Sequence, residues 1–283
     1  MALARTVRPL LPASLRRKIM PTLPTLATEP VPTTGRRMLL LDGCVQPVLA
    51  PQINQALTRV LGRLGIELIN TPDATCCGAL PHHLSATAKA RAMARQNIDA
   101  WWPLLEQGVE AVVITASGCT TQVRDYPHLL AGEPHYADKA RQLAEKVKDP
   151  VEILAAEDLA PLRVQPSGQR IAVHTPCSLQ HGLKLDGAVD RLLGGLGYQL
   201  TSVTESHLCC GSAGTYSLTQ PALSDRLRQR KLSALNVDRP ERIVTANIGC
   251  LGQLQEENGT PVSHWLNLLE EDLADCHESH AHP

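Results

Sequence analysis

Eight of the nine cysteines in this 283-residue chain fall into one pattern that occurs twice. In each copy a single cysteine is followed 32 positions later by a Cys-Cys-Gly triplet. A further single cysteine comes 42 positions after the pair in the first copy and 40 after it in the second. Buried packing cysteines have no reason to keep this spacing twice, whereas thiols that converge in space do. The two sets are Cys44, Cys76, Cys77 and Cys119, then Cys177, Cys209, Cys210 and Cys250.

Four thiolates are the ligand set that an iron–sulfur cluster needs. The chain lacks the tight C-x-x-C-x-x-C run of a ferredoxin, and it lacks the C-x-x-C and H-x-x-x-H pairs that are typical of zinc sites. We therefore expect each set to bind an iron–sulfur cluster, of the 4Fe–4S type. Zinc, a vicinal disulfide and buried structural thiols are the alternatives.

Composition excludes several other functions. The formal net charge of −1 argues against electrostatic binding of nucleic acid as the main activity. The absence of Phe, with only three Trp and four Tyr, leaves few aromatic side chains to stack on bases or a flavin ring. The first residues do not form a secretory signal, and no apolar run is long enough to span a membrane. A reducing cytoplasm is the default expectation, and there clustered cysteines indicate metal or redox sites.

The order of apolar runs predicts an α/β fold made of two tandem repeats related by a pseudo-twofold axis. Each repeat is expected to be a small, mainly parallel sheet flanked by helices. The expected strands are 38–41, 66–69, 111–114, 170–173, 198–203 and 242–245. The expected helices are 51–64, 84–107, 135–147, 186–197 and 222–236. The expected units are a basic, Pro-rich leader (1–36), the first repeat (37–164), the second repeat (165–275) and a polar, His-rich tail (276–283).

The leader is expected to be a tether. Docking to a membrane surface or a partner, and an organelle transit peptide, are the alternatives. In the tail Cys276 stands beside His277, His280 and His282. A solvated tail is the favoured interpretation, and adventitious metal binding comes second.

The single cysteines are expected just beyond the carboxyl ends of strands, the edge of a parallel sheet where ligands gather. Gly43, Gly118 and Gly249 directly precede three of them, and Pro176 precedes Cys177. Glycine there would let the backbone approach a bulky inorganic group and aim N–H groups at its sulfides. The two Cys-Cys-Gly triplets predict tight, irregular loops, because adjacent strand residues would point their thiols apart.

Other conspicuous residues are expected to play smaller parts. Several histidines near the cysteines are interpreted as hydrogen-bond donors around the site or as ordinary packing residues, with metal ligation or proton relay as alternatives. They are His82, His83, His174, His181 and His207. Trp101 and Trp102 are expected in the core or at a subunit interface. Asp42 and Glu205 lie close to cysteines, but lone carboxylates near loops are seldom catalytic.

The cysteine repeat resembles the cysteine-rich CCG domain of electron-transfer subunits. This group includes the cysteine-rich subunits of heterodisulfide reductase and of anaerobic glycerol-3-phosphate dehydrogenase, together with the lactate-utilisation iron–sulfur proteins. Residues of about 37–273 resemble most closely the bacterial glycolate oxidase iron–sulfur subunits. The segments that carry this resemblance are 41–47, 97–103, 115–119, 206–216 and 244–250.

The resemblance implies an electron-transfer subunit of a glycolate dehydrogenase complex. In that family flavin-bearing partner subunits, which hold FAD, oxidise glycolate or D-lactate, and the iron–sulfur subunit passes electrons toward the quinone pool. This chain itself would not bind glycolate. It would lie in the cytoplasm, peripherally on the inner face of the cytoplasmic membrane. The eight repeated cysteines would be the cluster ligands.

Two departures from the family pattern stand out. The family's subunits begin with a ferredoxin-like domain that this sequence lacks; a truncated sequence, a misassigned start or a separate ferredoxin-like protein would each account for that. The heterodisulfide reductase member of the group ends each repeat with C-x-x-C, whereas Gln122 and Gln253 occupy the last position here. Four cysteines per repeat, in place of five, argue against a thiol–disulfide reductase. That reductase and a scaffold without redox function are the rival interpretations.

Overall fold

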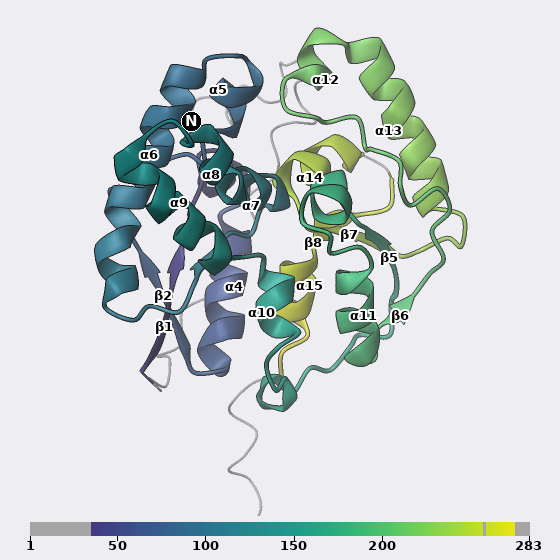
Figure 1. The fold of residues 1–283 in the computed structure, drawn as a ribbon. Coiled ribbons are helices and arrows are strands. Elements are labelled where there is room, and N and C mark those ends of the chain that lie inside the picture. The colour runs from purple at the N-terminus through teal and green to yellow at the C-terminus, as the bar shows by residue number, and fades with distance from the viewer. Residues whose placement is uncertain (1–34, 257–258, 275–283) are drawn as a thin grey trace, which may run out of the picture.

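The computed structural model describes residues 35–256 and 259–274. Two four-stranded sheets, entirely parallel, are flanked by helices (Figure 1). The strand orders are β2-β1-β3-β4 and β6-β5-β7-β8, so the two sheets have the same topology. This confirms the α/β prediction of two tandem repeats. The first sheet comprises β1 (Arg36–Leu40), β2 (Ile66–Asn70), β3 (Val112–Val113) and β4 (Val147–Lys148). The second comprises β5 (Arg170–His174), β6 (Gln199–Leu200), β7 (Arg242–Thr245) and β8 (Val262–His264).

The central strands follow the apolar runs of the sequence, because helices cover both faces of a parallel sheet and leave no polar face. Leu39 in β1 and Ile243 in β7 are fully buried. The predicted strand at 198–203 is shorter, since only Gln199 and Leu200 pair with β5. β4 and β8 were not predicted from the sequence. They are two and three residues long, too short to show a hydrophobic pattern.

The five predicted helices are present with slightly different ends, and several short helices accompany them. The helices of the first repeat are α3 (Gln46–Leu49), α4 (Gln52–Arg63), α5 (Ala79–His83), α6 (Thr87–Glu106), α7 (Ser117–Arg124), α8 (Tyr126–Leu129), α9 (Pro134–Lys146), α10 (Pro150–Leu154) and the 3-10 helix η2 (Ala160–Leu162). Those of the second are the π-helix η3 (Ser178–Gly182), α11 (Ala188–Gly195), α12 (Tyr216–Thr219), α13 (Pro221–Leu235), α14 (Ile248–Leu254) and α15 (Trp265–Glu271).

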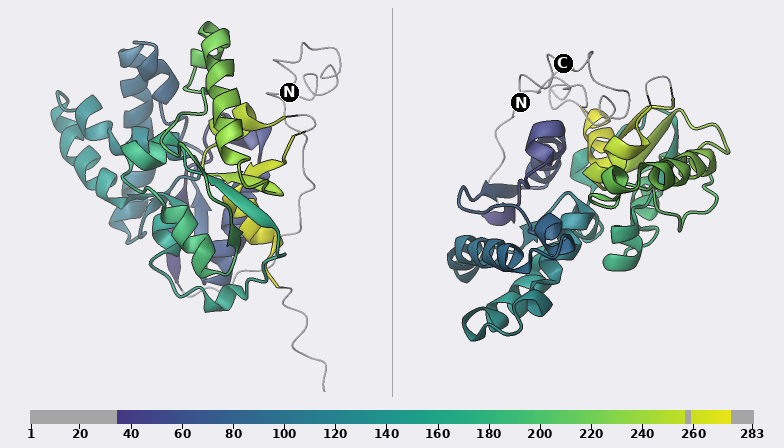
Figure 2. Two further views of the ribbon diagram at one scale, coloured as in Figure 1. Left: turned by 90° about the vertical axis from the view of Figure 1, so that its right-hand side faces the viewer. Right: turned by 90° about the horizontal axis from the view of Figure 1, so that it is seen from above.

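The two repeats pack against each other through a shared hydrophobic core. One cluster of buried residues joins Leu57 of α4, Ile171 of β5 and Trp265 of α15. Helices α4 and α15 contact each other between the two sheets (Figures 1 and 2), where the Asn267 amide donates to the Gln52 carbonyl at 3.1 Å. Each repeat has in addition its own outer core, under α6 and α9 in the first and under α13 in the second. The relative position of the two sheets is therefore fixed by burial.

The predicted leader and tail lie almost wholly outside the described residues. Of the leader only Gly35 and Arg36 are described, and Arg36 begins β1. Among the described helices none is both long and apolar enough to cross a membrane.

Asp149 makes the stability of the fold depend on pH. It caps α10 by accepting from the Val151 N–H at 3.1 Å, and burial raises its pKa from 3.8 to about 7. Between these two pH values the folded state binds more protons than the unfolded chain. The stabilisation by the protonated form is therefore complete below pH 4 and lost as the pH rises to about 7.

We expect Asp149→Asn to keep the capping oxygen and to remove this dependence. The native chain should lose up to about 4 kcal/mol of unfolding free energy from pH 4 to 7, and the variant should not show this loss. Above pH 7 the difference between the two unfolding free energies should stay constant. Urea unfolding at a series of pH values measures it. Parallel pH profiles for the two proteins would contradict the assignment.

Candidate metal centres

The first site lies at the carboxyl edge of the first sheet, between β1 and β3. The chain after β1 leads to β2 at one end of the sheet, and the chain after β3 leads to β4 at the other end. Cys44 follows β1, the Cys76–Cys77 pair follows β2, and Cys119 lies in the first turn of α7, just after β3. Cys44 is exposed, Cys77 is buried, and the other two are intermediate. The Cys77 and Cys119 sulfurs are 3.2 Å apart. The structure thus brings all four predicted thiols of this repeat together at one edge.

The second site repeats this arrangement. Cys177 follows β5 and is exposed, the Cys209–Cys210 pair follows β6, and Cys250 lies in the first turn of α14. The Gly211 backbone N–H donates to the Cys209 sulfur at 3.3 Å. Cys210 and Cys250 are buried, which makes this site more enclosed than the first.

Within each site the thiols are close enough for contact between them to shift the pKa of three of the four. In the first site the Cys44 thiol donates to Cys76, which lowers the pKa of Cys76 and raises that of Cys44. Contact with Cys119, and then with Cys76, raises the pKa of Cys77.

The second site shows the same pattern. Contact with Cys177 lowers the pKa of Cys209, and contact with Cys209 raises that of Cys177. Cys209 and Cys250 both raise the pKa of Cys210. A bound cation takes the place of thiol protons, so a group of thiols this close together suits a metal centre.

His174, the last residue of β5, points at the second site. Its Nδ1 lies 2.9 Å from the Thr245 hydroxyl, while its buried Nε2 has no hydrogen-bond partner in the described part of the chain. A ring nitrogen of His174 lies within 4.8 Å of the Cys210 and Cys250 sulfurs. Burial, and then the nearby Lys231 charge, lower the pKa of His174 to about 3, so the ring is neutral.

The triplet glycines hold the paired cysteines in their turns. Gly78 and Gly211 both have positive φ, +82° and +87°. Each packs against the backbone of the following long helix, so that an added Cβ would lie 3.3 Å from the Ala90 oxygen or 2.5 Å from the Ser224 oxygen. The predicted irregular loops are present. Glycine suits the third position because the positive φ strains other residues there, and at Gly211 a Cβ would also overlap the helix backbone.

The glycines before the single cysteines lie in two kinds of local structure, and their predicted role toward a bound group stays a prediction. Gly43 has positive φ, +80°, but Gly118 and Gly249 lie in helices α7 and α14. The Gly118 N–H faces the Asn247 amide oxygen at 3.5 Å, and a Cβ on Gly249 would crowd the Asn247 nitrogen at 3.2 Å. A small residue at Gly249 leaves room for Ser212 and Asn247, whereas a Cβ on Gly118 would meet Asn247 at an ordinary contact distance of 3.6 Å.

The two sites face each other across the boundary between the repeats. The Asn247 amide donates to the Cys250 sulfur at 3.6 Å and accepts from Gly118, the neighbour of Cys119. The hydroxyls of Ser117 and Ser178 are 2.8 Å apart. Ser117 stands two residues before Cys119 of the first site, and Ser178 directly follows Cys177 of the second. Figure 1 shows α7 and α14 side by side between the two halves. Asn247 was not predicted from the sequence, because a lone amide has no pattern.

The other singled-out residues lie further from the thiols or are engaged elsewhere. His82 contacts the Gln122 amide, His181 and His207 are exposed, and Glu205 forms an ion pair with Arg230. Asp42 accepts from the Asn54 amide at 3.1 Å. His83 is exposed, with its ring stacked on that of His82. Trp101 is a fully buried core residue, as predicted, and Trp102 is partly exposed.

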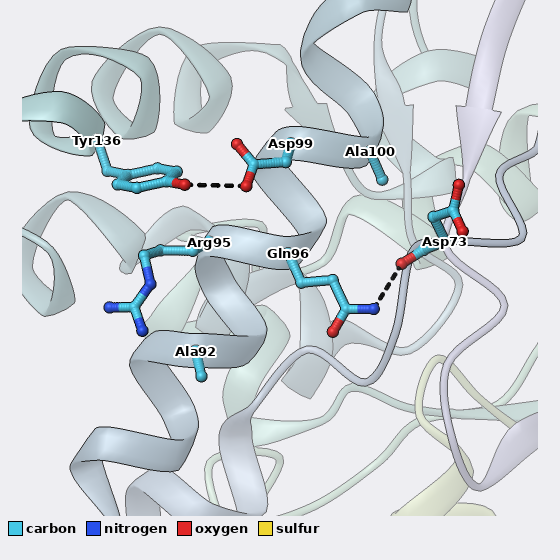
Figure 3. Close-up of a pocket in the computed structure, with 7 residues that line it drawn as sticks. All are labelled: Asp73, Ala92, Arg95, Gln96, Asp99, Ala100 and Tyr136. Carbon is cyan, nitrogen blue, oxygen red and sulfur yellow. Dashed lines mark hydrogen bonds between the residues drawn. The ribbon is translucent and has the colours of Figure 1, made fainter.

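A surface pocket lies beside α6 (Figure 3). The Tyr136 hydroxyl donates to Asp99 at 2.9 Å, and the Gln96 amide donates to the Asp73 carbonyl at 3.0 Å. Arg95 pairs with Glu133 at 2.9 Å. The pocket contains no cysteine among its described lining residues, and its main polar groups have partners within the protein.

Fold and sites together define a tandem α/β protein with one four-cysteine centre per repeat. The profile of the CCG family, described as a cysteine-rich domain, matches residues 38–124 and 171–255. The chain belongs to this family, and the two matches contain all eight repeated cysteines.

Curated relatives and a solved structure extend the comparison. The chain is 47% identical over 267 residues to the glycolate oxidase iron–sulfur subunit of Escherichia coli, covering 94% of this chain and 65% of that protein. It is 28% identical to lactate utilization protein A of Bacillus subtilis, covering 82% of this chain and 98% of that protein. A crystal structure of a hypothetical protein from Helicobacter pylori shares the fold, with a TM-score of 0.61, 10% identity, and coverage of 89% of this chain and 52% of that one.

Proposed function

We propose that this chain holds an iron–sulfur cluster, of the 4Fe–4S type, in each four-cysteine centre and serves as the electron-transfer part of a glycolate dehydrogenase complex. The convergence of four thiols in both repeats is the observation that carries the proposal. When bound, such clusters accept and release single electrons. The chain's own part is to supply the thiolates, to bury the inner cysteines and to direct backbone N–H groups such as that of Gly211 at sulfur.

The similarity to the E. coli protein and to lactate utilization protein A supports glycolate or lactate as the electron source, and we propose the D-isomer of lactate. We place the oxidation itself on FAD-bearing partner subunits, and the acceptor in the quinone pool. A peripheral position on the inner face of the cytoplasmic membrane fits that acceptor. The chain spans 65% of the length of the E. coli relative. A separate ferredoxin-like protein is a further proposed partner of the complex.

Anaerobic purification tests the cluster directly. We expect a brown protein that contains iron and acid-labile sulfide, with both lost together on treatment with an iron chelator. Protein that stays colourless and free of iron after anaerobic reconstitution would overturn the proposal. Bleaching of the visible absorption by glycolate, only when the flavin subunits are added, tests the place in the complex.

A thiol–disulfide reductase is the second candidate, favoured by the 3.2 Å approach of the Cys77 and Cys119 sulfurs. It predicts that the isolated chain reduces a disulfide with a reduced dye as donor.

Cys209→Ser separates electron relay from a scaffold. Loss of electron transfer in an assembled complex supports the relay, and unchanged transfer supports the scaffold.

A further inference from the structure

The two centres have the same cysteines but different surroundings. His174 stands three positions before Cys177, and the residue three positions before Cys44 is Leu41. Thr245, the partner of His174, stands five positions before Cys250, whereas Ile114 stands five before Cys119. All four are buried. The polar pair of the second repeat is therefore replaced in the first by two aliphatic side chains, which have no hydrogen bond to give.

The unpartnered Nε2 of His174 is costly unless something accepts from it, because a buried polar atom without a partner is destabilising. The Thr245 hydroxyl lies 2.9 Å from Nδ1 and can donate to it, and the tautomer that accepts this bond carries the ring proton on Nε2. We assign this tautomer because it gives the buried Nε2 a proton to donate toward the sulfurs. The nearby acceptors are the Cys210 and Cys250 sulfurs and whatever those sulfurs bind. This nitrogen is therefore a hydrogen-bond donor that the fold holds close to the second centre.

A second difference lies on the long helix behind each cysteine pair. Ala90 and Ser224 hold equivalent places, because each packs against its triplet glycine. Seven positions further on stand Asn97 in the first repeat and Lys231 in the second. Both side chains are fully buried. The glycine contacts therefore show that Asn97 and Lys231 occupy equivalent positions, with a neutral amide in the first repeat and an ammonium group in the second.

Lys231 brings positive charge to the second centre. Its Nζ donates to the carbonyls of Glu205 and Ser206, at 3.2 and 2.8 Å, just before the cysteine pair. No carboxylate lies within ion-pair distance of it in the described residues. Burial lowers the pKa of Lys231, while the charges of Cys210, Cys250 and Cys209 act in the opposite direction.

In the first repeat neutral groups occupy this place. The Asn97 amide donates to the Cys76 carbonyl at 3.1 Å and to the Tyr126 hydroxyl at 2.9 Å. Tyr126 in turn donates to the Cys77 carbonyl at 3.0 Å. This network orients the loop without adding charge, and the cation that acts on the first centre is the solvent-exposed Lys89, whose charge lowers the pKa of Cys76. Solvent screens an exposed charge more than a buried one such as that of Lys231.

Reduction adds one negative charge to a cluster, so a nearby cation and N–H donors stabilise the reduced form and raise its potential. We infer that His174 and Lys231 make the two centres unequal, with His174 donating Nε2–H to sulfur and Lys231 adding positive charge, so that the second centre has the higher reduction potential. This rests on the proposed binding of clusters. It makes the second centre the place where a single added electron resides at equilibrium.

Single-centre proteins test this. Cys77→Ser should leave only the second centre loaded, and Cys210→Ser only the first. Redox titration with dithionite, followed by electron paramagnetic resonance, gives a midpoint potential for each. We expect the second centre to be higher by at least a tenfold equilibrium ratio, which is about 59 mV for one electron.

Side-chain replacements then assign the difference. In the Cys77→Ser protein, Lys231→Gln and His174→Leu should each lower the midpoint, while Lys231→Arg and His174→Gln should keep most of it. In the Cys210→Ser protein the same replacements should change nothing. Lys139→Gln, which removes a charge that lies over the Trp102 ring, is the matched control.

Equal midpoint potentials in the two single-centre proteins would overturn the inference. So would a second-centre midpoint potential that neither Lys231→Gln nor His174→Leu changes. A strong ¹⁴N hyperfine coupling that disappears in His174→Leu would show direct ligation and overturn the hydrogen-bond assignment. Absence of iron from both single-centre proteins and from the native chain would instead contradict the proposed function. If Lys231→Gln fails to bind iron, the comparison of His174→Leu with His174→Gln still decides.

Discussion

Cys210→Ser should remove the iron and sulfide of one centre and leave the other intact. Cys210 is buried in the second centre, in contact with Cys209 and Cys250, and its sulfur lies within 4.8 Å of His174 and of Cys250. A serine hydroxyl is a poor ligand for iron and does not ionise there as a thiolate does. We therefore expect about half of the native iron and sulfide per chain, with the first-centre spectrum unchanged.

The chain offers a matched control for this loss. Cys276 is the one cysteine outside the repeated pattern, and Cys276→Ser should leave iron, sulfide and colour unchanged. Cys77→Ser should give the complementary loss in the first centre. If Cys210→Ser kept the full iron content, the eight cysteines would not form two separate four-thiol sites. If it lost all iron, the two centres would depend on each other for assembly.

The positions of the thiols could be predicted from the sequence because the same chain path is taken twice. Cys44 and Cys177 follow equivalent strands, and the equal spacing to each pair reflects equal connections at one sheet edge. The short strands β4 and β8 could not be predicted, because they are defined by pairing with β3 and β7 and not by a pattern in their own residues.

What separates the two centres was much harder to predict. Equivalence of Lys231 and Asn97 emerges only from the packing of Gly211 on Ser224 and Gly78 on Ala90, because the connecting segments differ in length by one residue. The sequence shows His174 near Cys177, but its unpartnered nitrogen depends on where Thr245 lies across the sheet. Contacts between distant residues, which no local pattern encodes, carry this information.

The approach of the repeats adds a functional consequence. Asn247 touches the Cys250 sulfur and the backbone next to Cys119, so the amide of one residue connects both centres. A Cβ on Gly182 would lie 2.7 Å from the Thr121 hydroxyl, so η3 and α7 are also in close contact. For the clusters that we propose, these direct contacts between the repeats would favour electron transfer from one centre to the other.

Gly211→Ala should destabilise the fold more than alanine at either Gly78 or Gly168. Its φ of +87° costs an alanine about 1–3 kcal/mol, and the new Cβ would lie 2.5 Å from the Ser224 carbonyl oxygen. That oxygen belongs to the backbone of α13, so it cannot swing aside as a flexible side chain could. Relief of the overlap must shift the helix or the cysteine turn, at a further cost of about 1–3 kcal/mol.

Urea unfolding of the reduced, metal-free chain measures this cost, with Gly168→Ala as the control. Gly168 has a similar φ, +79°, but open space where the Cβ would go, so it should show the backbone strain alone. Gly78→Ala, with its Cβ 3.3 Å from the Ala90 oxygen, should fall between the two. Equal losses for Gly211→Ala and Gly168→Ala would mean that the turn does not press on α13. Because that turn aims Cys209 and Cys210, reduced iron content of the second centre alone should accompany the larger loss.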